Sequence, residues 1–239
     1  FNLFLQSILR ANPKMRFVCV GDDWQAINGY AGSDTTYLQS FTSHFPGAAY
    51  ATLLTNFRSP EIIVEAGNNL MRGHGEKAQS NRPGGEIWIH TLPEVTDKSQ
   101  RYQLMPDAYI NAIRGIIAKY PENTSFAILK RTNDFFHIPA YNLETRIREG
   151  FRNRSIEIST VHTFKGREAD VVIVVEVTER KFPLFHQDRS RHRILGHTDE
   201  KLLLEERRLF YVAVTRAKLV VHLITEEGRQ SPFIKDLTL

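Results

Sequence analysis

The stretch IEISTVHTFKGREADVVIVVEV, at residues 156–177, sets a polar segment between two apolar ones. Residues 156–161 and 171–177 have the composition of β-strands, and the second run is almost wholly apolar. A strand of this kind is typical of the centre of a parallel sheet, where helices cover both faces. The polar segment therefore belongs to the connection between these two strands.

Apolar strands and amphipathic helices alternate along the rest of the chain. Further strands are predicted at residues 16–20, 50–54, 86–92, 126–129 and 219–224. Helices are predicted at residues 3–10, 34–45, 59–70, 107–119 and 200–211. The helix at 59–70 has Ser59 as its expected N-cap and Pro60 at its first position. Residues 73–85 and 93–106 are expected to form a surface loop and a polar linker. This alternation predicts an α/β fold with right-handed crossovers.

The composition is that of an ordinary globular protein, with 41% hydrophobic residues and 24% charged residues among 239. Cys19 is the only cysteine, so an internal disulfide and a cysteine-based zinc site are excluded, and a reducing cytoplasm is the expected location. No apolar run approaches the ~18 residues of a membrane span. The net charge of +4 permits a nucleic-acid partner. Because Phe1 opens directly into an expected helix, the chain is expected to begin inside a longer protein.

Four segments carry polar residues at an expected strand end, the edge where open α/β sheets bind ligands. They are VGDDWQAI at residues 20–27, LTNFRSP at 54–60, STVHTFKGRE at 159–168 and EERRLFYVAVTRAK at 205–218. An arginine before a helix N-terminus favours an anion, and a loop rich in hydroxyls and glycine can hold phosphates. Each segment also has a purely structural interpretation, such as a capped turn or intrahelical ion pairs of ~0.3–0.5 kcal/mol each.

Together and in this order, the four segments resemble motifs III, IV, V and VI of superfamily 1 DNA helicases of the UvrD/Rep type, nearest to the helicase IV branch. The resemblance implies a RecA-like parallel sheet flanked by helices. It further implies that residues 1–45 are the tail of a first RecA-like domain and that residues 46–239 are the second. The spacing between the second and third segments leaves no room for a large inserted domain.

The resemblance implies a catalytic role for three residues. Gln25 would sense the γ-phosphate of ATP or its attacking water. Arg58 and Arg216 would bind the γ-phosphate from across a cleft, with Arg216 as the arginine finger. Their two guanidinium groups are expected to converge beside a nucleotide-sized gap on the exposed rim of the fold. Replacement of Arg216 by alanine in the longer protein is expected to abolish ATP hydrolysis and to leave the fold intact.

Other residues would contact the nucleoside and the nucleic acid. By the same resemblance, Phe57 would stack on adenine, Glu168 would accept a hydrogen bond from the ribose, and Gly166 would lie in the phosphate-binding loop. The residues that would contact single-stranded DNA are Tyr30, Thr160 and His162. Asn28 and Ala31 depart from the family pattern, so the DNA contact beside Tyr30 is expected to be thinner.

The sequence contains no G-x-x-x-x-G-K-[ST] loop, and the acidic motif that holds Mg²⁺ in this family is absent. ATP and Mg²⁺ are therefore expected cofactors whose main ligands lie in an N-terminal ATPase domain of the same protein. The partners implied are single-stranded and duplex DNA, with 3′ to 5′ movement, and no membrane. The chain alone is expected to be inactive as an ATPase and to bind single-stranded DNA weakly, with strong dependence on salt.

Three alternatives remain at this point. The chain could be a non-catalytic docking module with a helicase-like fold, although such a module has no need of γ-phosphate sensors. It could be the motor of a helicase–nuclease, but Asp170 and Glu176 have no suitable lysine between them. It could act on RNA, since none of these residues is specific for a 2′-hydroxyl.

Overall fold

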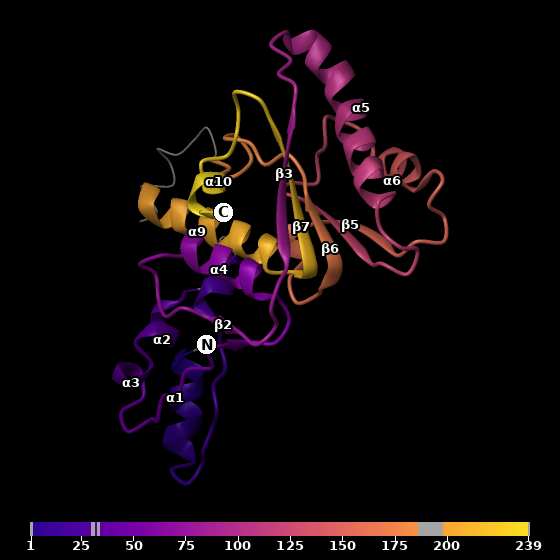
Figure 1. Ribbon diagram of the computed structural model, residues 1–239. Helices are drawn as coiled ribbons and strands as arrows, with labels where there is room; N and C mark the ends of the chain where they lie inside the picture. Colours follow the sequence, from indigo (N-terminus) through magenta and orange to yellow (C-terminus); the bar gives the residue numbers. More distant parts are fainter. Residues whose placement is uncertain (1, 30–31, 33, 186–197, 239) are drawn as a thin grey trace. The chain divides into compact units, whose positions relative to one another are not determined.

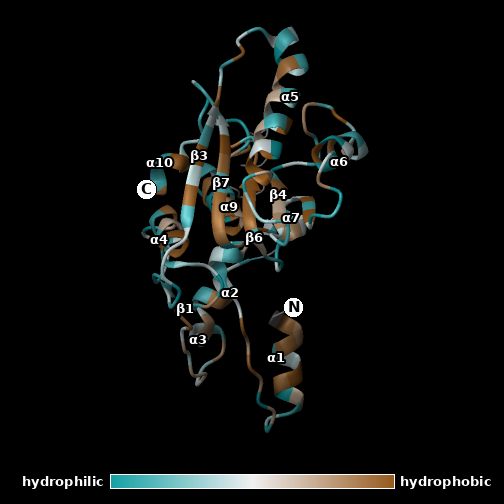
Figure 2. Ribbon diagram, turned by 45° about the vertical axis from the view of Figure 1, so that its right-hand side comes forward, coloured by the Kyte–Doolittle hydropathy of each residue, from teal (hydrophilic) through white to brown (hydrophobic). Residues whose placement is uncertain are grey.

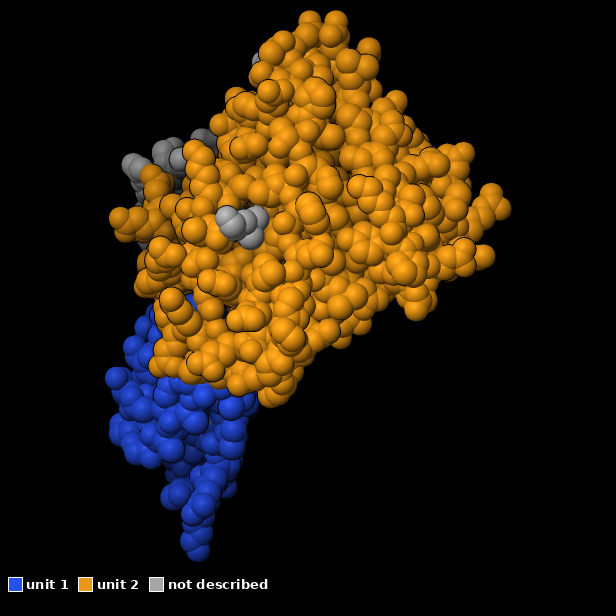
Figure 3. Space-filling model, in the orientation of Figure 1, with its two compact units in different colours: residues 1–53 blue, residues 54–239 orange. Residues whose placement is uncertain are grey.

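The computed structural model describes residues 2–29, 32, 34–185 and 198–238. The chain forms two compact units, residues 1–53 and residues 54–239, which Figure 3 colours separately. The prediction for Tyr30 lies outside the described residues.

The first unit contains short helices: α1 (Asn2–Ala11), the 3₁₀ helix η1 (Asp23–Gln25), α2 (Thr36–Gln39) and α3 (Phe41–His44). The helix predicted at 34–45 is thus divided at Ser40, whose backbone is not helical. The strand predicted at 16–20 is wrong, because these residues have no neighbouring strand among the described residues and Val18 is 89% exposed. An extended segment needs such a neighbour to pair its backbone groups.

The described residues of the second unit form seven strands in two sheets. The strands are β1 (Thr55–Asn56), β2 (Gln79–Ser80), β3 (Glu86–Leu92), β4 (Phe126–Lys130), β5 (Ile156–Thr160), β6 (Ala169–Val174) and β7 (Ala217–Glu226). β1 and β2 form a small parallel pair. The other five form one sheet in the order β3-β7-β6-β4-β5, and every pair in it is parallel. The predicted α/β fold with a parallel sheet is confirmed.

Helices cover both faces of this sheet (Figure 1). The helices are α4 (Glu61–Leu70), α5 (Lys98–Ile117), α6 (Ala140–Arg148), α7 (Val161–Phe164), α9 (Asp199–Val214) and α10 (Phe233–Asp236). α4, α7, α9 and α10 pack on one face, and α5 and α6 pack together on the other. The order of layers is helix, sheet, helix, as expected for strands that are apolar on both sides.

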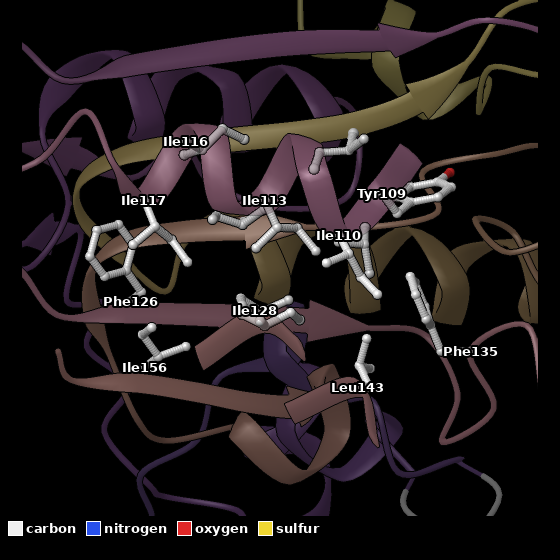
Figure 4. Close-up of a cluster of buried hydrophobic side chains, with 14 of the residues drawn as sticks. Tyr109, Ile110, Ile113, Ile116, Ile117, Phe126, Ile128, Phe135, Leu143 and Ile156 are labelled. Carbon is white, nitrogen blue, oxygen red and sulfur yellow. The ribbon is translucent and has the colours of Figure 1, made fainter. Parts of the chain in front are cut away.

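The core under α5 shows why the sequence folds in this way. Ile110, Ile113 and Ile117 recur at helical spacing and point toward Phe126 and Ile128 of β4 (Figure 4). The most hydrophobic strands, β4, β6 and β7, lie in the middle of the sheet, whereas the edge strand β3 is more polar (Figure 2). Burial of these side chains contributes about 1.5–3 kcal/mol for each large aliphatic residue.

Two further predictions are wrong. Residues 98–106 of the linker predicted at 93–106 belong to α5, which begins after Asp97 and continues through Pro106. The Asp97 carboxylate accepts hydrogen bonds from the N–H groups of Ser99 and Gln100 at 2.7 and 3.1 Å, and this cap starts the helix eight residues before the proline. The strand predicted at 50–54 is also wrong, because these residues form no strand, and only Thr55 and Asn56, which follow them, pair with β2.

Candidate functional site

The loop that carries Arg58 lies between β1 and α4, and it is held by its own side chains. The Asn56 side-chain oxygen accepts hydrogen bonds from the backbone N–H groups of Arg58 and Ser59, both at 2.9 Å. The Arg82 guanidinium group donates to the Arg58 carbonyl. The backbone on both sides of the Arg58 side chain is therefore fixed.

Glu168 is the partner of the Arg58 side chain. Arg58 Nε donates to Glu168 Oε2 at 2.8 Å, and the two side chains remain 28% and 47% exposed. This hydrogen bond is the main cause that lowers the pKa of the Glu168 carboxyl. The nearby charges of Lys218 and Arg216 act in the same direction, against the effect of burial. Glu168 is thus an ionised carboxylate surrounded by cations.

Arg216 lies between the end of α9 and the start of β7. Its backbone carbonyl accepts a hydrogen bond from Ala169 N–H at 3.2 Å, which places it next to Glu168 in the sheet. The expectation that its guanidinium lies on the exposed rim is wrong, because Arg216 is only 1% exposed. Its Nε donates to the Val212 carbonyl at 3.1 Å, one helical turn back. Helices α4 and α9 pack closely at this point and exclude solvent.

The position of these residues in the sheet also differs from the prediction. Ligand-binding side chains were expected at the carboxyl ends of the strands. Glu168 and Arg216 instead directly precede β6 and β7. They therefore lie on the side of the sheet where its parallel strands begin, here called the amino edge, and the side where the strands end is called the carboxyl edge. The reason is that the polar segment 159–168 leaves the sheet at one edge and returns at the other.

Thr160 and His162 remain at the carboxyl edge. The Thr160 hydroxyl caps α7 by accepting a hydrogen bond from Thr163 N–H at 3.2 Å, and His162 is half-buried in this helix. Ser159 of β5 and Val174 of β6 both pair with Leu129. The six residues of β6, about 20 Å, therefore separate the level of Thr160 from that of Glu168.

The other predicted residues have separate surroundings. Phe57 is 72% exposed, and its ring is available for stacking. Gly166 has a φ of +86°, a conformation that favours glycine, in the turn before Glu168. Gln25 lies in η1 of the first unit, where its side-chain amide donates to Asp22. The three residues that the structure brings together are Arg58, Glu168 and Arg216.

Sequence reasoning missed the residues that hold this group in place. Ser59 is buried, and its hydroxyl donates to the Ala217 carbonyl instead of capping α4, whose N-cap is Pro60. Lys218 forms an ion pair with Asp170 at 3.1 Å, close to Glu168. The only signal for Ser59 in the sequence is its place beside Arg58, which also suits a helix cap.

The described ranges contain neither a metal-binding cluster nor a membrane-spanning helix. No group of three or more histidine, cysteine, aspartate or glutamate residues there has the geometry to hold a metal ion. None of the described helices is long and apolar enough to cross a bilayer.

Comparisons with known proteins show what the chain is similar to. Residues 128–228 match the family model of the UvrD-like helicase C-terminal domain. DNA helicase IV of Escherichia coli is 29% identical over 98% of this chain and 33% of its own length. A protein of Mycoplasma pneumoniae named "Probable DNA helicase" is 26% identical over 91% of the chain and 40% of its own length.

One solved structure is the C-terminal domain of a possible DNA helicase from Lactobacillus plantarum, with a TM-score of 0.40 and 14% identity over 76% of this chain and 94% of that chain. The chain spans about a third of the length of the E. coli relative. Residues 128–228 are thus similar to the UvrD-like helicase C-terminal domain, and the relatives that match most of the chain are named as DNA helicases.

Proposed function

We propose that this chain supplies the second half of the ATPase site of a 3′ to 5′ DNA helicase. Its Arg58 would contact the γ-phosphate of an ATP molecule, and Gln25 would sense the same phosphate. Arg216 is buried, so it would contact the γ-phosphate only after its side chain turns outward. An N-terminal ATPase domain of the longer protein would supply the phosphate-binding loop and the ligands of Mg²⁺. ATP hydrolysis would then drive movement along single-stranded DNA and the unwinding of duplex DNA.

The observation that carries this proposal is the meeting of Arg58, Glu168 and Arg216 at the amino edge of the sheet. The Arg58–Glu168 hydrogen bond joins residues 110 positions apart. Arg58 donates to Glu168 through Nε, and its planar fork carries two further nitrogens that can donate to phosphate oxygens. A guanidinium fork is the group that best matches phosphate oxygens.

The surrounding residues fit the other parts of ATP. Glu168 is 47% exposed, so an ionised oxygen can accept a hydrogen bond from a ribose hydroxyl. Phe57 presents an exposed ring for adenine. The chain itself contains no lysine-bearing phosphate loop. Most of the affinity for the triphosphate would therefore come from the N-terminal ATPase domain, and this chain would add charge stabilisation in the transition state.

The DNA-binding residues would act at a different place. Thr160 and His162 lie at the carboxyl edge, with Tyr30 as a further candidate from the sequence. The length of β6 separates Thr160 from Glu168, so DNA and nucleotide could be bound at the same time. Contacts to phosphate and stacking on bases do not depend on sequence, which suits a translocating motor.

A nucleotide-binding experiment tests the role of Arg58. In the longer protein, Arg58→Ala is expected to weaken binding of ATP, because the γ-phosphate loses its partner. ADP has no γ-phosphate, so its binding should stay within about twofold, well below the tenfold change that corresponds to about 1.4 kcal/mol. Arg152→Ala is the control, because Arg152 is an exposed arginine away from this loop. Equal loss of ATP and ADP affinity in Arg58→Ala would contradict the assignment.

The isolated chain provides a second test. It is expected to show no Mg²⁺-dependent ATP hydrolysis, because it lacks the phosphate loop. It is also expected to bind a fluorescent single-stranded oligonucleotide weakly, with affinity that falls steeply between 50 and 200 mM salt. Robust turnover by the chain alone, or binding that does not change with salt, would overturn these expectations.

A further inference from the structure

Ser59 forms a direct link between the two segments that carry the arginines. Its side chain is fully buried, and its hydroxyl donates to the Ala217 carbonyl at 2.9 Å. The same oxygen lies 3.3 Å from the Thr215 carbonyl. Ser59 follows Arg58 directly, and the two carbonyls are those on either side of Arg216. One hydroxyl group therefore connects the backbone of one arginine to the backbone of the other.

The loop on the Arg58 side is rigid enough to transmit this link. Asn56 binds the N–H groups of Arg58 and Ser59, as described above. The Ser80 hydroxyl donates to the Ser59 carbonyl at 2.8 Å. The backbone around Ser59 is thus fixed at both its N–H and its carbonyl, so a shift at Ala217 would be felt at Arg58.

A glycine sets the distance that the hydroxyl has to bridge. A Cβ atom at Gly67 of α4 would lie 2.9 Å from a ring carbon of Tyr211 and 3.4 Å from a methyl of Thr215. Any larger residue would push α4 away from the end of α9. The close packing at Gly67 keeps Ser59, at the start of the same helix, within hydrogen-bond reach of the segment 215–217.

We propose that Ser59 is a positioning residue that holds Arg58 and Arg216 in one mutual arrangement, so that both guanidinium groups meet the same triphosphate. This inference rests on the proposed function of the two arginines. Ser59 itself contacts no nucleotide in this proposal. It acts by fixing the backbone of Arg58 relative to Arg216, and a displacement of about 1 Å at such a site can lower a rate by about a hundredfold.

The test compares Ser59→Ala with Ser231→Ala in the longer protein. Ser231 is also buried, and its hydroxyl also donates to a distant backbone carbonyl, that of Phe182. The two substitutions remove the same chemical group, but Ser231 lies beyond the end of β7, away from both arginines. A general effect of losing a buried hydrogen bond would appear in both variants.

We expect Ser59→Ala to lower kcat for ATP hydrolysis by roughly tenfold to a hundredfold, with a much smaller change in KM, since the affected contacts act in the transition state. Ser231→Ala is expected to keep the kcat of the unmodified protein. If Ser59→Ala does not fold, Ser59→Cys keeps a weak donor of similar size and should give an intermediate kcat. Turnover by Ser59→Ala or Ser59→Cys equal to that of Ser231→Ala would overturn the proposal.

Hydrogen exchange separates this inference from the proposed function. Without nucleotide, amides of residues 211–217 should exchange faster in Ser59→Ala than in Ser231→Ala, because the tether is lost. Unchanged exchange there would overturn the link, whatever the turnover. A different result would reject the proposed function instead: faster exchange in Ser59→Ala, together with normal turnover in variants of Arg58 and Arg216. Normal turnover by Ser59→Ala, with turnover lost in the arginine variants, would reject only the positioning role.

Discussion

The two edges of the five-stranded sheet hold their charged residues in opposite states. At the amino edge, Arg58 and Glu168 form one ion pair that stays partly exposed. At the carboxyl edge, Glu226 is 1% exposed and is bound by Arg101 and by the Tyr109 hydroxyl, the latter at 3.0 Å. Charges that meet a ligand need access, whereas charges that join α5 to the end of β7 need burial and several partners. Arg216 is the exception, since it is buried although it belongs to the amino edge.

The largest effect on stability is expected at the carboxyl edge. Glu226→Gln removes the buried charge that the partly buried Arg101 and Arg229 face, and breaking such a pair costs about 3–5 kcal/mol. Urea unfolding of the chain measures this change. A loss below about 1 kcal/mol, the range of exposed pairs, would remove the contrast between the two edges.

A pH-dependent effect is expected from Glu176, which also lies at the carboxyl edge and is 5% exposed. Burial raises its pKa to about 7, against the nearby Lys181 at 3.6 Å. Because this pKa is higher in the folded state than in the unfolded chain, the folded state loses stability as the pH rises from about 4.5 to about 7. Glu176→Gln should therefore stabilise the chain at pH 8 by about 2–3 kcal/mol relative to its effect at pH 4.5.

The measurement is the free energy of unfolding of Glu176→Gln minus that of the unmodified chain across this pH range. The subtraction cancels His222, whose pKa burial lowers to about 4 and which has the opposite pH dependence. The difference should rise with pH and level off above about 7. A difference that is constant with pH would show that the pKa of Glu176 is not raised in the folded chain.

The smallest effect on stability is expected at the amino edge. Glu168→Gln breaks a pair whose side chains are 28% and 47% exposed, so its unfolding free energy should change by less than about 1 kcal/mol. Its ATP turnover in the longer protein should nevertheless fall, because Arg58 loses the group that orients it. Strong destabilisation with normal turnover would reverse the comparison between the edges.

The sequence predicted the sheet better than the site. β3 matches its prediction at both ends, because an alternating run bounded by glycine and proline has a clear length. The start of α5 was missed because Pro106 suggested a helix start, whereas the Asp97 cap and the burial of Met105 extend the helix through it. The segment at 16–20 has the right composition for a strand but no neighbour among the described residues.

The motifs predicted the residues of the candidate site, but not their arrangement. Periodicity places Glu168 and Arg216 near strand ends without saying which edge they share. The role of Ser59 depends on a contact with Ala217, 158 positions away, and local sequence patterns carry no information on such contacts. A serine before a helix suits a cap equally well, so the tertiary contact decided between the two roles.

The most direct test of the central claim is ATP turnover by Arg216→Met in the longer protein. Methionine fills most of the buried volume that alanine would leave empty, and an unfolding curve of the same variant shows that it is folded. The account predicts that kcat falls by about 10³-fold or more, with Arg152→Met unchanged, because an arginine at the γ-phosphate contributes about that factor. A folded Arg216→Met protein with kcat within tenfold of the unmodified protein would contradict it.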